Sequence, residues 1–506
     1  MLHLTSARVL FERAGLSGRA IDLPDDAVIT SLTDDSRSVT PGACFVAIRG
    51  VHLDGHRFVA QAVNAGARVV VVQEDAAGVD VPEEVFVLPV GDTREALARL
   101  AAAYYALDER SATVPRLIGV TGTNGKTTVC HLLRSILMAA GETPAMLGTV
   151  EYDLVGSKVP APMTTPAPMD LCRYLSLARD AGASSVVMEV SSHALDQRRC
   201  DGLRFAAGVF TNLSQDHIDY HQSLQAYFQA KCRLFERLDR DATAVVNVDD
   251  VLGSRVESAT RAVVRSYGLD RPADVTASNC RMTSTSSRLL LRGCAYEVEV
   301  ECPLIGRHNI MNVLAAAATA EALGVEAAAI RKGVEGLGGV PGRLQRVTYE
   351  EHPFQVYVDY AHTDAALENV LDVLKPMTAG RLICVFGCGG DRDRSKRPRM
   401  AKAVERRADL AVVTSDNPRT EDPRRIVCDA LAGFNAEGDC LVVVEIDRKD
   451  AIHEALLAAQ PGDTVLIAGK GHEDYQIVGC QRRSFDDRVV ARECLEALGV
   501  EVSAGA

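Results

Sequence analysis

The sequence contains no tryptophan, and aromatic residues account for only 5% of its 506 positions. Its fourteen cysteines include no paired CxxC spacing, which argues against both a zinc site and a disulfide framework. No apolar run is long enough to span a membrane, and the N-terminal residues lack the apolar segment of a signal peptide. We therefore expect a cytoplasmic protein without membrane insertion, in which most cysteines are buried thiols.

The charge balance is acidic, with a formal net charge of -13. This charge argues against nucleic acid as the main partner, because a phosphate backbone would be repelled. Hydrophobic residues at 47% and charged residues at 24% are typical of an ordinary globular protein. A chain of this length is expected to form two to four domains, each with its own core.

A glycine-rich segment carries the strongest functional signal. It reads Gly-Val-Thr-Gly-Thr-Asn-Gly-Lys-Thr-Thr over residues 119–128, between an apolar strand-like run and a helical pattern. The backbone N–H groups of such a loop bind phosphate, while Lys126 reaches the terminal phosphates and the Thr127 hydroxyl is available to Mg²⁺. Val120 stands where the strict nucleotide-loop pattern has glycine, so the segment is a variant. The alternative is a glycine-rich turn without a chemical role.

Strand-like runs alternate with helical patterns, which predicts an α/β fold with mainly parallel sheets. We expect a small α/β domain over residues 1–104, a central P-loop domain over 105–340 and a Rossmann-like doubly wound domain over 341–506. The predicted strands are 43–48 and 67–73, then 117–120, 185–190, 207–212 and 244–248, then 355–358, 382–386, 410–414, 441–446 and 464–468.

Polar side chains follow several of the predicted central strands. Ligands of parallel sheets bind beyond the carboxyl ends of the strands, so Glu189 and His217 are expected near the glycine-rich loop. A carboxylate at Glu189 can share Mg²⁺ with Thr127. Either residue alone would more often be a helix cap or a satisfied polar group. Lys231 lies in a helical pattern over 226–235, where the sequence alone predicts an exposed lysine.

Several long motifs occur in a fixed order along the chain. They cover residues 122–128, 188–193, 210–217 and 306–312, and the similarity extends from Asp-Ser-Arg at 35–37 to Asp-Asp-Arg at 486–488. In these motifs the chain resembles the Mur ligase family, whose members build the peptide stem of bacterial cell-wall precursors. The resemblance implies three domains that bind the uridine nucleotide, ATP and the incoming amino acid.

The resemblance also implies ATP as co-substrate, Mg²⁺ as cofactor and a set of site residues. The expected ATP-binding residues are Gly122, Thr123, Asn124, Gly125, Lys126, Thr127, Thr128, His308, Asn309, Asn312, Arg343 and Asp359. The expected metal ligands are Thr127, Glu189, His217 and Lys231, and the expected catalytic residues are Lys126, Glu189, His217 and Lys231. Lys231 matches the lysine that the family carbamylates to N6-carboxylysine, which converts an ammonium into an anionic oxygen ligand.

Within the family, the details are most similar to the enzyme that adds the third stem residue. The residues matching its contacts to the UDP-muramoyl-dipeptide are Ser36, Asp54, His56, Thr164, Thr165, Ser191, Gln197 and Arg199. Met163 replaces an asparagine that is frequent in relatives, which puts one side-chain contact in doubt. Asp364 replaces the usual proline after Tyr-Ala-His-Thr, a change expected to alter a turn.

The Asp-Asn-Pro-Arg motif at 416–419 points to the amino acid that is added. Relatives that add meso-diaminopimelate carry this motif, and lysine-adding relatives lack its arginine. Arg419 can bind the distal carboxylate of diaminopimelate bidentately, while Asp416 and Glu473 suit its ammonium. The expected pocket consists of Arg392, Asp416, Asn417, Arg419, Gly469 and Glu473. The alternative is a turn followed by a helix cap, because Asn-Pro is a common turn signal.

The resemblance thus implies an ATP-dependent amide ligase that joins meso-2,6-diaminopimelate to UDP-N-acetylmuramoyl-L-alanyl-D-glutamate through an acyl phosphate. We expect small-molecule substrates and a monomer. One alternative is a ligase similar to folylpolyglutamate synthetase, which would not need the motifs at 35–37 and 416–419. The non-enzyme alternative, a nucleotide-dependent switch, predicts a guanine-reading Asn-Lys-x-Asp motif that the sequence lacks. No residue stands out as the base for the amine.

Overall fold

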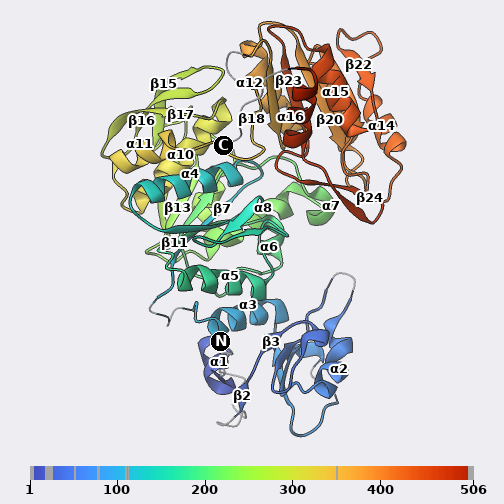
Figure 1. Cartoon of the computed structure of the whole chain (residues 1–506). Helices are drawn as coiled ribbons and strands as arrows, with labels where there is room; N and C mark the ends of the chain where they lie inside the picture. The colour runs from blue at the N-terminus through green and yellow to red at the C-terminus, as the bar shows by residue number, and fades with distance from the viewer. Residues whose placement is uncertain are drawn as a thin grey trace.

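The computed structural model describes residues 5–16, 27–50, 53–76, 80–108, 111, 113–348 and 352–499. The N-terminal part lies at the bottom of Figure 1, the central part in the middle and the C-terminal part at the upper right. Within the described ranges, no helix combines the length and the apolar character needed to cross a bilayer.

The N-terminal part is built on a four-stranded parallel sheet in the order β3-β4-β5-β6. Its strands are β3 (Leu32–Thr33), β4 (Cys44–Val46), β5 (Val69–Gln73) and β6 (Phe86–Val90). The described residues of this part also form a short antiparallel pair of strands, β1 (Thr5–Ser6) and β2 (Val28–Ile29), and the α-helices α1 (Ala7–Arg13), α2 (Val59–Asn64) and α3 (Thr93–Tyr104). Helix α3 packs against α5 (Pro168–Asp180), which joins this part to the central one (Figure 1).

The central part is built on an eight-stranded sheet in the order β10-β9-β8-β11-β7-β12-β13-β14. Strand β7 (Arg116–Thr121) lies in the interior, parallel to β11 (Ser185–Glu189) and β12 (Phe205–Phe210) on its two sides. The other strands are β8 (Pro144–Leu147), β9 (Glu151–Asp153), β10 (Lys158–Pro160), β13 (Thr243–Asn247) and β14 (Val263–Tyr267). Because β7, β11 and β12 are parallel neighbours, the loops that follow them meet at one edge of the sheet.

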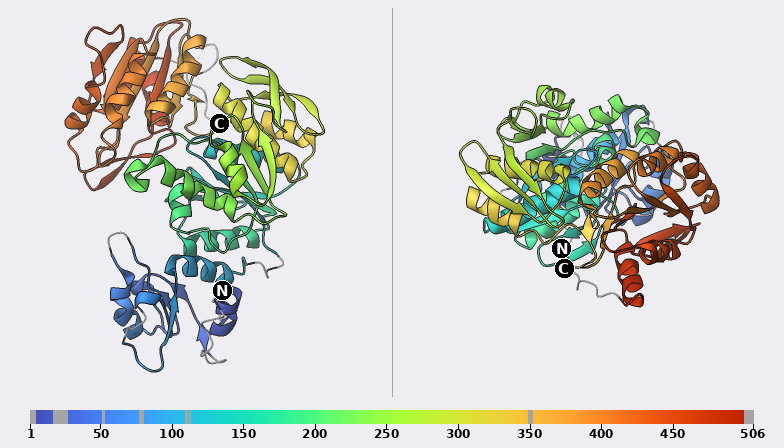
Figure 2. Two further views of the ribbon diagram at one scale, coloured as in Figure 1. Left: turned by 180° about the vertical axis from the view of Figure 1, so that it is seen from behind. Right: turned by 90° about the horizontal axis from the view of Figure 1, so that it is seen from above.

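Helices cover both faces of this sheet. One face is covered by α4 (Lys126–Ala139), α10 (Arg307–Ala322) and α11 (Ala327–Glu335), and the other mainly by α5 and α8 (Leu224–Glu236). Three shorter helices are α6 (Ser192–Asp196), α7 (Ile218–His221) and α9 (Gly253–Ala259). An antiparallel sheet of β15 (Thr276–Met282), β16 (Ser287–Arg292) and β17 (Glu297–Cys302) packs against α11 on the flank of the molecule (Figure 2).

The C-terminal part is a second doubly wound unit, with the strand order β18-β19-β23-β20-β21-β22. All its strands are parallel except β18. They are β18 (Gln345–Arg346), β19 (Gln355–Asp359), β20 (Leu382–Cys388), β21 (Leu410–Ser415), β22 (Leu441–Val444) and β23 (Thr464–Ala468). One face is covered by α12 (Asp364–Leu374), α13 (Lys396–Glu405) and α14 (Pro423–Leu431), the other by α15 (Arg448–Ala458) and α16 (Asp487–Ala497). A hairpin of β24 (Tyr475–Val478) and β25 (Gln481–Ser484) follows β23.

These elements confirm the predicted α/β class with mainly parallel sheets. Each predicted strand is present within two or three residues, and the strand predicted at 464–468 has the same bounds in the structure. The strand predicted at 207–212 ends at Phe210, because Thr211 and Asn212 turn toward the glycine-rich loop and hydrogen-bond to it. The prediction of buried thiols is also confirmed, since nine of the fourteen cysteines are buried. The domain boundaries near residues 104 and 340 stay predictions.

Candidate active site

The glycine-rich loop joins β7 to α4 and is shaped by its glycines. Gly122 has φ +148°, and a Cβ there would lie 1.8 Å from the hydroxyl oxygen of Thr211. Gly125 has φ +86°, a left-handed conformation directly before the helix. The Nζ of Lys126 donates to the carbonyls of Gly122 at 3.0 Å and Thr123 at 2.9 Å, so the lysine folds back over the loop. This strand, loop and helix N-terminus form the predicted phosphate-binding geometry.

Thr127 and Glu189 are in direct contact beside this loop. The Thr127 hydroxyl donates to Glu189 Oε1 at 3.0 Å. The backbone N–H and the hydroxyl of Thr149 donate to the same carboxylate, at 2.8 Å and 3.0 Å. Arg343, from the C-terminal part, donates from Nη2 to the Thr127 hydroxyl at 3.2 Å. A hydroxyl and a carboxylate placed together are hard oxygen donors, which fit Mg²⁺.

Lys231 is not a surface residue, so the expectation from helix propensity was wrong. It is 1% exposed on α8, and its Nζ donates to the carbonyl of Gly122 at 2.7 Å. The Nζ lies 4.4 Å from the centroid of the Tyr227 ring. Burial, and then the nearby charge of Lys126, hold the pKa of Lys231 well below its usual range. Asp216 opposes this shift, but no carboxylate among the described residues forms an ion pair with Lys231, so the buried lysine is better accommodated as a neutral amine.

His217 lies in a different part of the site from the Thr127–Glu189 pair. Its side chain is 45% exposed, and its backbone is left-handed with φ +53°. The His217 ring packs edge-on against the ring of His193, with centroids 4.8 Å apart. Of the four predicted metal ligands, Thr127 and Glu189 are hydrogen-bonded to each other, Lys231 is hydrogen-bonded to the glycine-rich loop, and His217 lines the larger cavity described below.

A cavity of about 180 Å³ opens beside the glycine-rich loop. Predicted nucleotide contacts in its wall are Asn124, Gly125, Thr128, His308, Asn309, Asn312, Arg343 and Asp359. Asn312 donates to Asn309 Oδ1 at 3.0 Å, and Asn309 donates to the carbonyl of Ile305 at 2.8 Å, which holds both amides in place. Burial and the charge of Arg343 lower the pKa of His308 to about 4, so this ring is neutral at pH 7.

The sequence interpretation missed several residues of the same cavity. Asn247 and Tyr267 lie at the ends of β13 and β14, and Asn369 and Val370 come from α12. Asn247 donates to the carbonyl of Thr211 at 2.7 Å. Polar residues at consecutive strand ends were the available signal for Asn247 and Tyr267.

Asp359 stabilises the local backbone through hydrogen bonds to its carboxylate. Its two carboxylate oxygens accept from the backbone N–H groups of Leu344 at 2.6 Å and Ala361 at 2.8 Å. Burial raises the pKa of this carboxyl group, and the charge of Arg343 opposes that shift. The guanidinium of Arg343 lies over the ring of Tyr360 at 4.7 Å. Asp359 therefore holds the turn that carries Arg343 to the loop.

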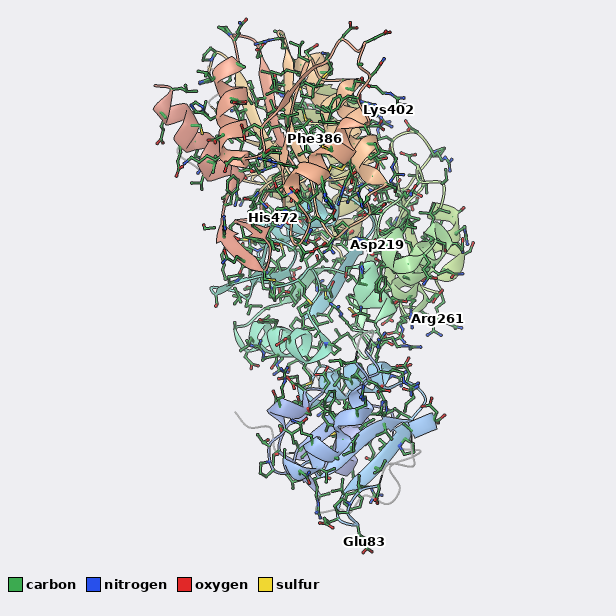
Figure 3. All side chains as sticks on the ribbon, turned by 90° about the vertical axis from the view of Figure 1, so that its right-hand side faces the viewer. Glu83, Asp219, Arg261, Phe386, Lys402 and His472 are labelled. Carbon is green, nitrogen blue, oxygen red and sulfur yellow. The ribbon has the colours of Figure 1, made fainter. Side chains whose placement is uncertain are left out.

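A second cavity, of about 560 Å³, lies between the central and C-terminal parts. Its wall includes Arg392, Asp416, Asn417, Arg419, Gly469 and Glu473, the six residues predicted to bind the amino acid. Side chains of the central part, including His193, Asp216 and His217, form the facing wall. Asp219 of this wall and His472, on the loop after β23, are labelled in Figure 3 at the level where the two parts meet.

Lys470 is a cavity neighbour that the sequence interpretation missed. Its side chain is fully buried, and its Nζ donates to Glu473 Oε2 at 2.9 Å. Asn417 donates to the same oxygen at 3.0 Å. These bonds occupy Oε2 of Glu473, and no hydrogen bond from the described residues reaches Oε1, which is left for another donor.

Arg419 is held at the rim of this cavity by its backbone. Its φ is +52°, its N–H donates to the carbonyl of Ile477 at 3.0 Å, and its carbonyl accepts from Gly479 at 2.7 Å. These backbone hydrogen bonds to the β24–β25 hairpin fix the position of Arg419. Its Nη1 donates to the carbonyl of Gly390 at 2.7 Å.

The residues predicted to contact the muramoyl-dipeptide form two separate groups. In the central part, Thr165, Ser191, Gln197 and Arg199 belong to one hydrogen-bond network beside Glu189, with Arg199 donating to Gln197 Oε1 at 2.7 Å. Thr164 is bonded to the hydroxyl of Thr149 at 3.1 Å. Met163 accepts from Arg199 at its sulfur, 3.1 Å away.

The second group lies in the N-terminal part. The Ser36 hydroxyl donates to Gln61 Oε1 at 3.2 Å. His56 is bonded to Asp54 through Nδ1 at 2.6 Å, and its Nε2 accepts from the backbone N–H of Gln73 at 2.9 Å. Because both ring nitrogens are occupied, His56 braces the loop to β5. Asp364, where relatives carry proline, begins α12 and pairs with Arg399 at 3.5 Å.

Comparison with known proteins agrees with this arrangement. Three family models match the chain in order: "Mur ligase family, catalytic domain" at residues 28–105, "Mur ligase middle domain" at 120–320, and "Mur ligase, glutamate ligase domain" at 342–471. The chain belongs to the Mur ligase family. The three matched segments correspond to the three parts of this Mur ligase.

The chain is similar to Mur ligases from several organisms. The "UDP-N-acetylmuramoyl-L-alanyl-D-glutamate--2,6-diaminopimelate ligase" of Gloeobacter violaceus is 45% identical over 486 residues, covering 96% of this chain and 97% of the relative. The protein of the same name from Geobacter metallireducens is 46% identical over 483 residues, covering 91% and 93%. A solved structure of an enzyme with this name is 32% identical, with a TM-score of 0.70 and coverage of 98% of this chain and 100% of that one.

Proposed function

We propose that this Mur ligase catalyses the ATP-dependent addition of meso-2,6-diaminopimelate to UDP-N-acetylmuramoyl-L-alanyl-D-glutamate, in the synthesis of peptidoglycan precursors. The observation that carries the proposal is that all six residues predicted for the amino acid line one cavity, next to the nucleotide cavity. The full-length relatives named for this reaction support it. We further propose that the protein acts in the cytoplasm as a monomer.

The first step of the proposed reaction transfers a phosphoryl group. The D-glutamate side-chain carboxylate attacks the γ-phosphate of ATP and forms an acyl phosphate. The loop amides and Lys126 hold the phosphates, and Thr127, Glu189, His217 and Lys231 would hold Mg²⁺. When bound, Mg²⁺ neutralises the charge of the transferred group, which is the main requirement of phosphoryl transfer.

The environment of Lys231 supports its role as a carbamate. CO₂ reacts with the neutral amine, and burial beside Lys126 keeps Lys231 in that form. The product would be an anion, which relieves the repulsion between two neighbouring lysines. It would also add an oxygen donor beside Gly122 of the loop.

The second step joins the amino acid to the activated carboxyl group. We propose that Arg419 binds the distal carboxylate of diaminopimelate and that Asp416 and the free Oε1 of Glu473 bind its distal ammonium. L-Lysine lacks this carboxylate and would leave Arg419 unpaired in the cavity. The cost of such an unpaired charge is about 2–5 kcal/mol, which corresponds to discrimination of about 30-fold to several thousandfold.

The two alternatives have less support. A folylpolyglutamate synthetase-like ligase would share the fold and the phosphate-binding loop, but it would not need an arginine at 419 beside Asp416. A nucleotide switch would not need a second cavity lined by the predicted amino-acid residues.

One experiment distinguishes the proposed ligase from the two alternatives. Purified protein is mixed with ATP, Mg²⁺ and UDP-muramoyl-dipeptide, and phosphate release is measured with meso-diaminopimelate or with L-lysine. We expect release with diaminopimelate. Release with lysine alone would contradict the proposed specificity, and no release with either amino acid would contradict the proposed function.

A further inference from the structure

His362 lies between the two cavities. It belongs to the turn between β19 and α12, and it lines both the nucleotide cavity and the amino-acid cavity, as does its neighbour Tyr360. The acyl phosphate is made on the nucleotide side, and the amine arrives on the amino-acid side. A side chain at this position therefore faces the place where the two reactants meet.

The imidazole of His362 is oriented by its own loop. Its Nδ1 lies 2.9 Å from the carbonyl oxygen of Tyr360, and the Tyr360 ring packs edge-on against it at 4.6 Å. A carbonyl only accepts, so Nδ1 carries the hydrogen and Nε2 carries the lone pair. Among the described residues, no side chain or backbone group donates to this Nε2. The ring thus offers a free acceptor to the cavities.

Charged and titratable groups from several elements lie near this ring. They are Lys396 on α13, Asp216 before α7, Asp416 after β21 and His472 after β23, in addition to Tyr360 beside it. Burial, followed by the charge of Lys396, lowers the pKa of His362, while the carboxylates oppose this shift. The ring is therefore neutral at pH 7.

Several other groups in the cavity wall are less suited to accept a proton. Arg392, Lys396 and Arg419 are cations. Glu473, whose Oε2 accepts from Lys470 and Asn417, and Asp416 are both assigned to the distal ammonium. His217 is assigned to the metal.

We propose that His362 is the general base that accepts the proton of the attacking amine. The amine nitrogen forms a bond to the acyl carbon, and the nitrogen of the resulting tetrahedral adduct loses a proton to Nε2. The C–O bond to phosphate then breaks with its electron pair on the departing phosphate, and the imidazolium returns its proton to solvent. A weak base suffices, because the protonated nitrogen of the adduct is far more acidic than a free ammonium. This role rests on the proposed ligase reaction.

The test compares two nucleophiles on the His362→Gln variant. Both nucleophiles form an adduct with a protonated nitrogen, but the electron-withdrawing oxygen of hydroxylamine makes its adduct acidic enough to lose the proton to water. Hydroxylamine therefore traps the acyl phosphate as a hydroxamate without a base, whereas the less acidic diaminopimelate adduct needs one. General-base catalysis contributes about 10²–10⁴-fold, so we expect kcat with diaminopimelate to fall by about that factor. Hydroxamate formation from ATP and UDP-muramoyl-dipeptide should stay within a few-fold of wild type, which also shows that the variant is folded and binds ATP.

His352→Gln is the matched control, because its Nδ1 is also bonded to a nearby backbone carbonyl in the same part of the chain, outside both cavity walls. It should leave both reactions unchanged. The acid limb of the wild-type pH profile for kcat, where His362 becomes protonated, should be absent in His362→Gln, and imidazole should restore activity to His362→Ala.

The outcomes separate the two proposals. Equal losses in the diaminopimelate and hydroxylamine reactions, or no loss in either, would overturn the role of His362. A wild-type protein that forms neither product from ATP and UDP-muramoyl-dipeptide would overturn the ligase function itself, and the role of His362 with it.

Discussion

Replacing Arg419 with methionine should remove the preference for diaminopimelate while preserving the fold. The backbone at this position is left-handed and bonded on both sides to the β24–β25 hairpin, so an unbranched replacement is required. The side chain bonds the protein through Nη1, to the carbonyls of Gly390 and Asn417 at 2.7 Å and 3.5 Å. Its Nε and Nη2 make no hydrogen bonds to the described residues, which leaves two parallel donors for a carboxylate.

The expected magnitude follows from the charge that is lost. Truncating one partner of a buried, hydrogen-bonded charge pair costs about 2–5 kcal/mol. At 1.4 kcal/mol per tenfold change, kcat/KM for diaminopimelate should fall by about 30-fold to several thousandfold. L-Lysine has no distal carboxylate for Arg419 to bind, so the kcat/KM for L-lysine should stay within a few-fold of wild type or rise. The ratio of kcat/KM for diaminopimelate to kcat/KM for L-lysine should therefore fall by nearly the same factor, about 30-fold to several thousandfold.

The assay is phosphate release at saturating ATP and UDP-muramoyl-dipeptide, with either amino acid varied. Arg424→Met is the control, because Arg424 is an exposed arginine five residues further along and lies outside the cavity wall. An Arg419→Met protein that keeps the wild-type ratio would refute the assignment of the distal carboxylate to this arginine. An equal loss of kcat/KM with both amino acids would show that Arg419 maintains the structure of the cavity and does not bind the distal carboxylate.

Three further predictions concern the central and C-terminal parts. Lys231→Ala should lose phosphate release and regain part of it with added short carboxylates, and indifference to them would count against carbamylation. Gly122→Ala should abolish ATP-dependent turnover, because its Cβ would lie 1.8 Å from Thr211, whereas Gly156→Ala, with φ +82° and no atom within 4 Å, should stay active. Asp487→Ala leaves the fully buried Arg448 without its carboxylate and should lower the free energy of unfolding by about 3–5 kcal/mol, measured by urea denaturation; a loss below 1 kcal/mol would contradict this.

The fold could be predicted from the sequence where the signals were local. An apolar run followed by the loop at 119–128 determines a strand, a phosphate-binding turn and a helix, and the structure contains all three. The three-stranded sheet β15–β17 was not predicted. Its strands have partly exposed residues, and β15 pairs irregularly with β16, so they lack the continuous apolar run that marked the buried parallel strands.

Side-chain roles were harder to predict when they depend on distant parts of the chain. Helix propensity placed Lys231 on the surface, but its environment is set by Gly122, more than one hundred residues earlier in the sequence. Lys470 has no motif to mark it, and its importance follows from the contact with Glu473 in the folded loop. Asp359 and His56 were expected to touch ligands, and in the structure they first hold backbone N–H groups.

The contact between Arg343 and Thr127 ties the chemistry to the arrangement of the two α/β parts. Arg343 belongs to the C-terminal part, and its guanidinium reaches the hydroxyl that is expected to bind Mg²⁺. The turn that carries it is held by Asp359, and Tyr360 and His362 of the following segment line both cavities. This short segment thus forms part of the wall that the nucleotide cavity shares with the amino-acid cavity. An acyl phosphate hydrolyses readily, so we expect the segment at this shared wall to help exclude water from the intermediate until the amine arrives.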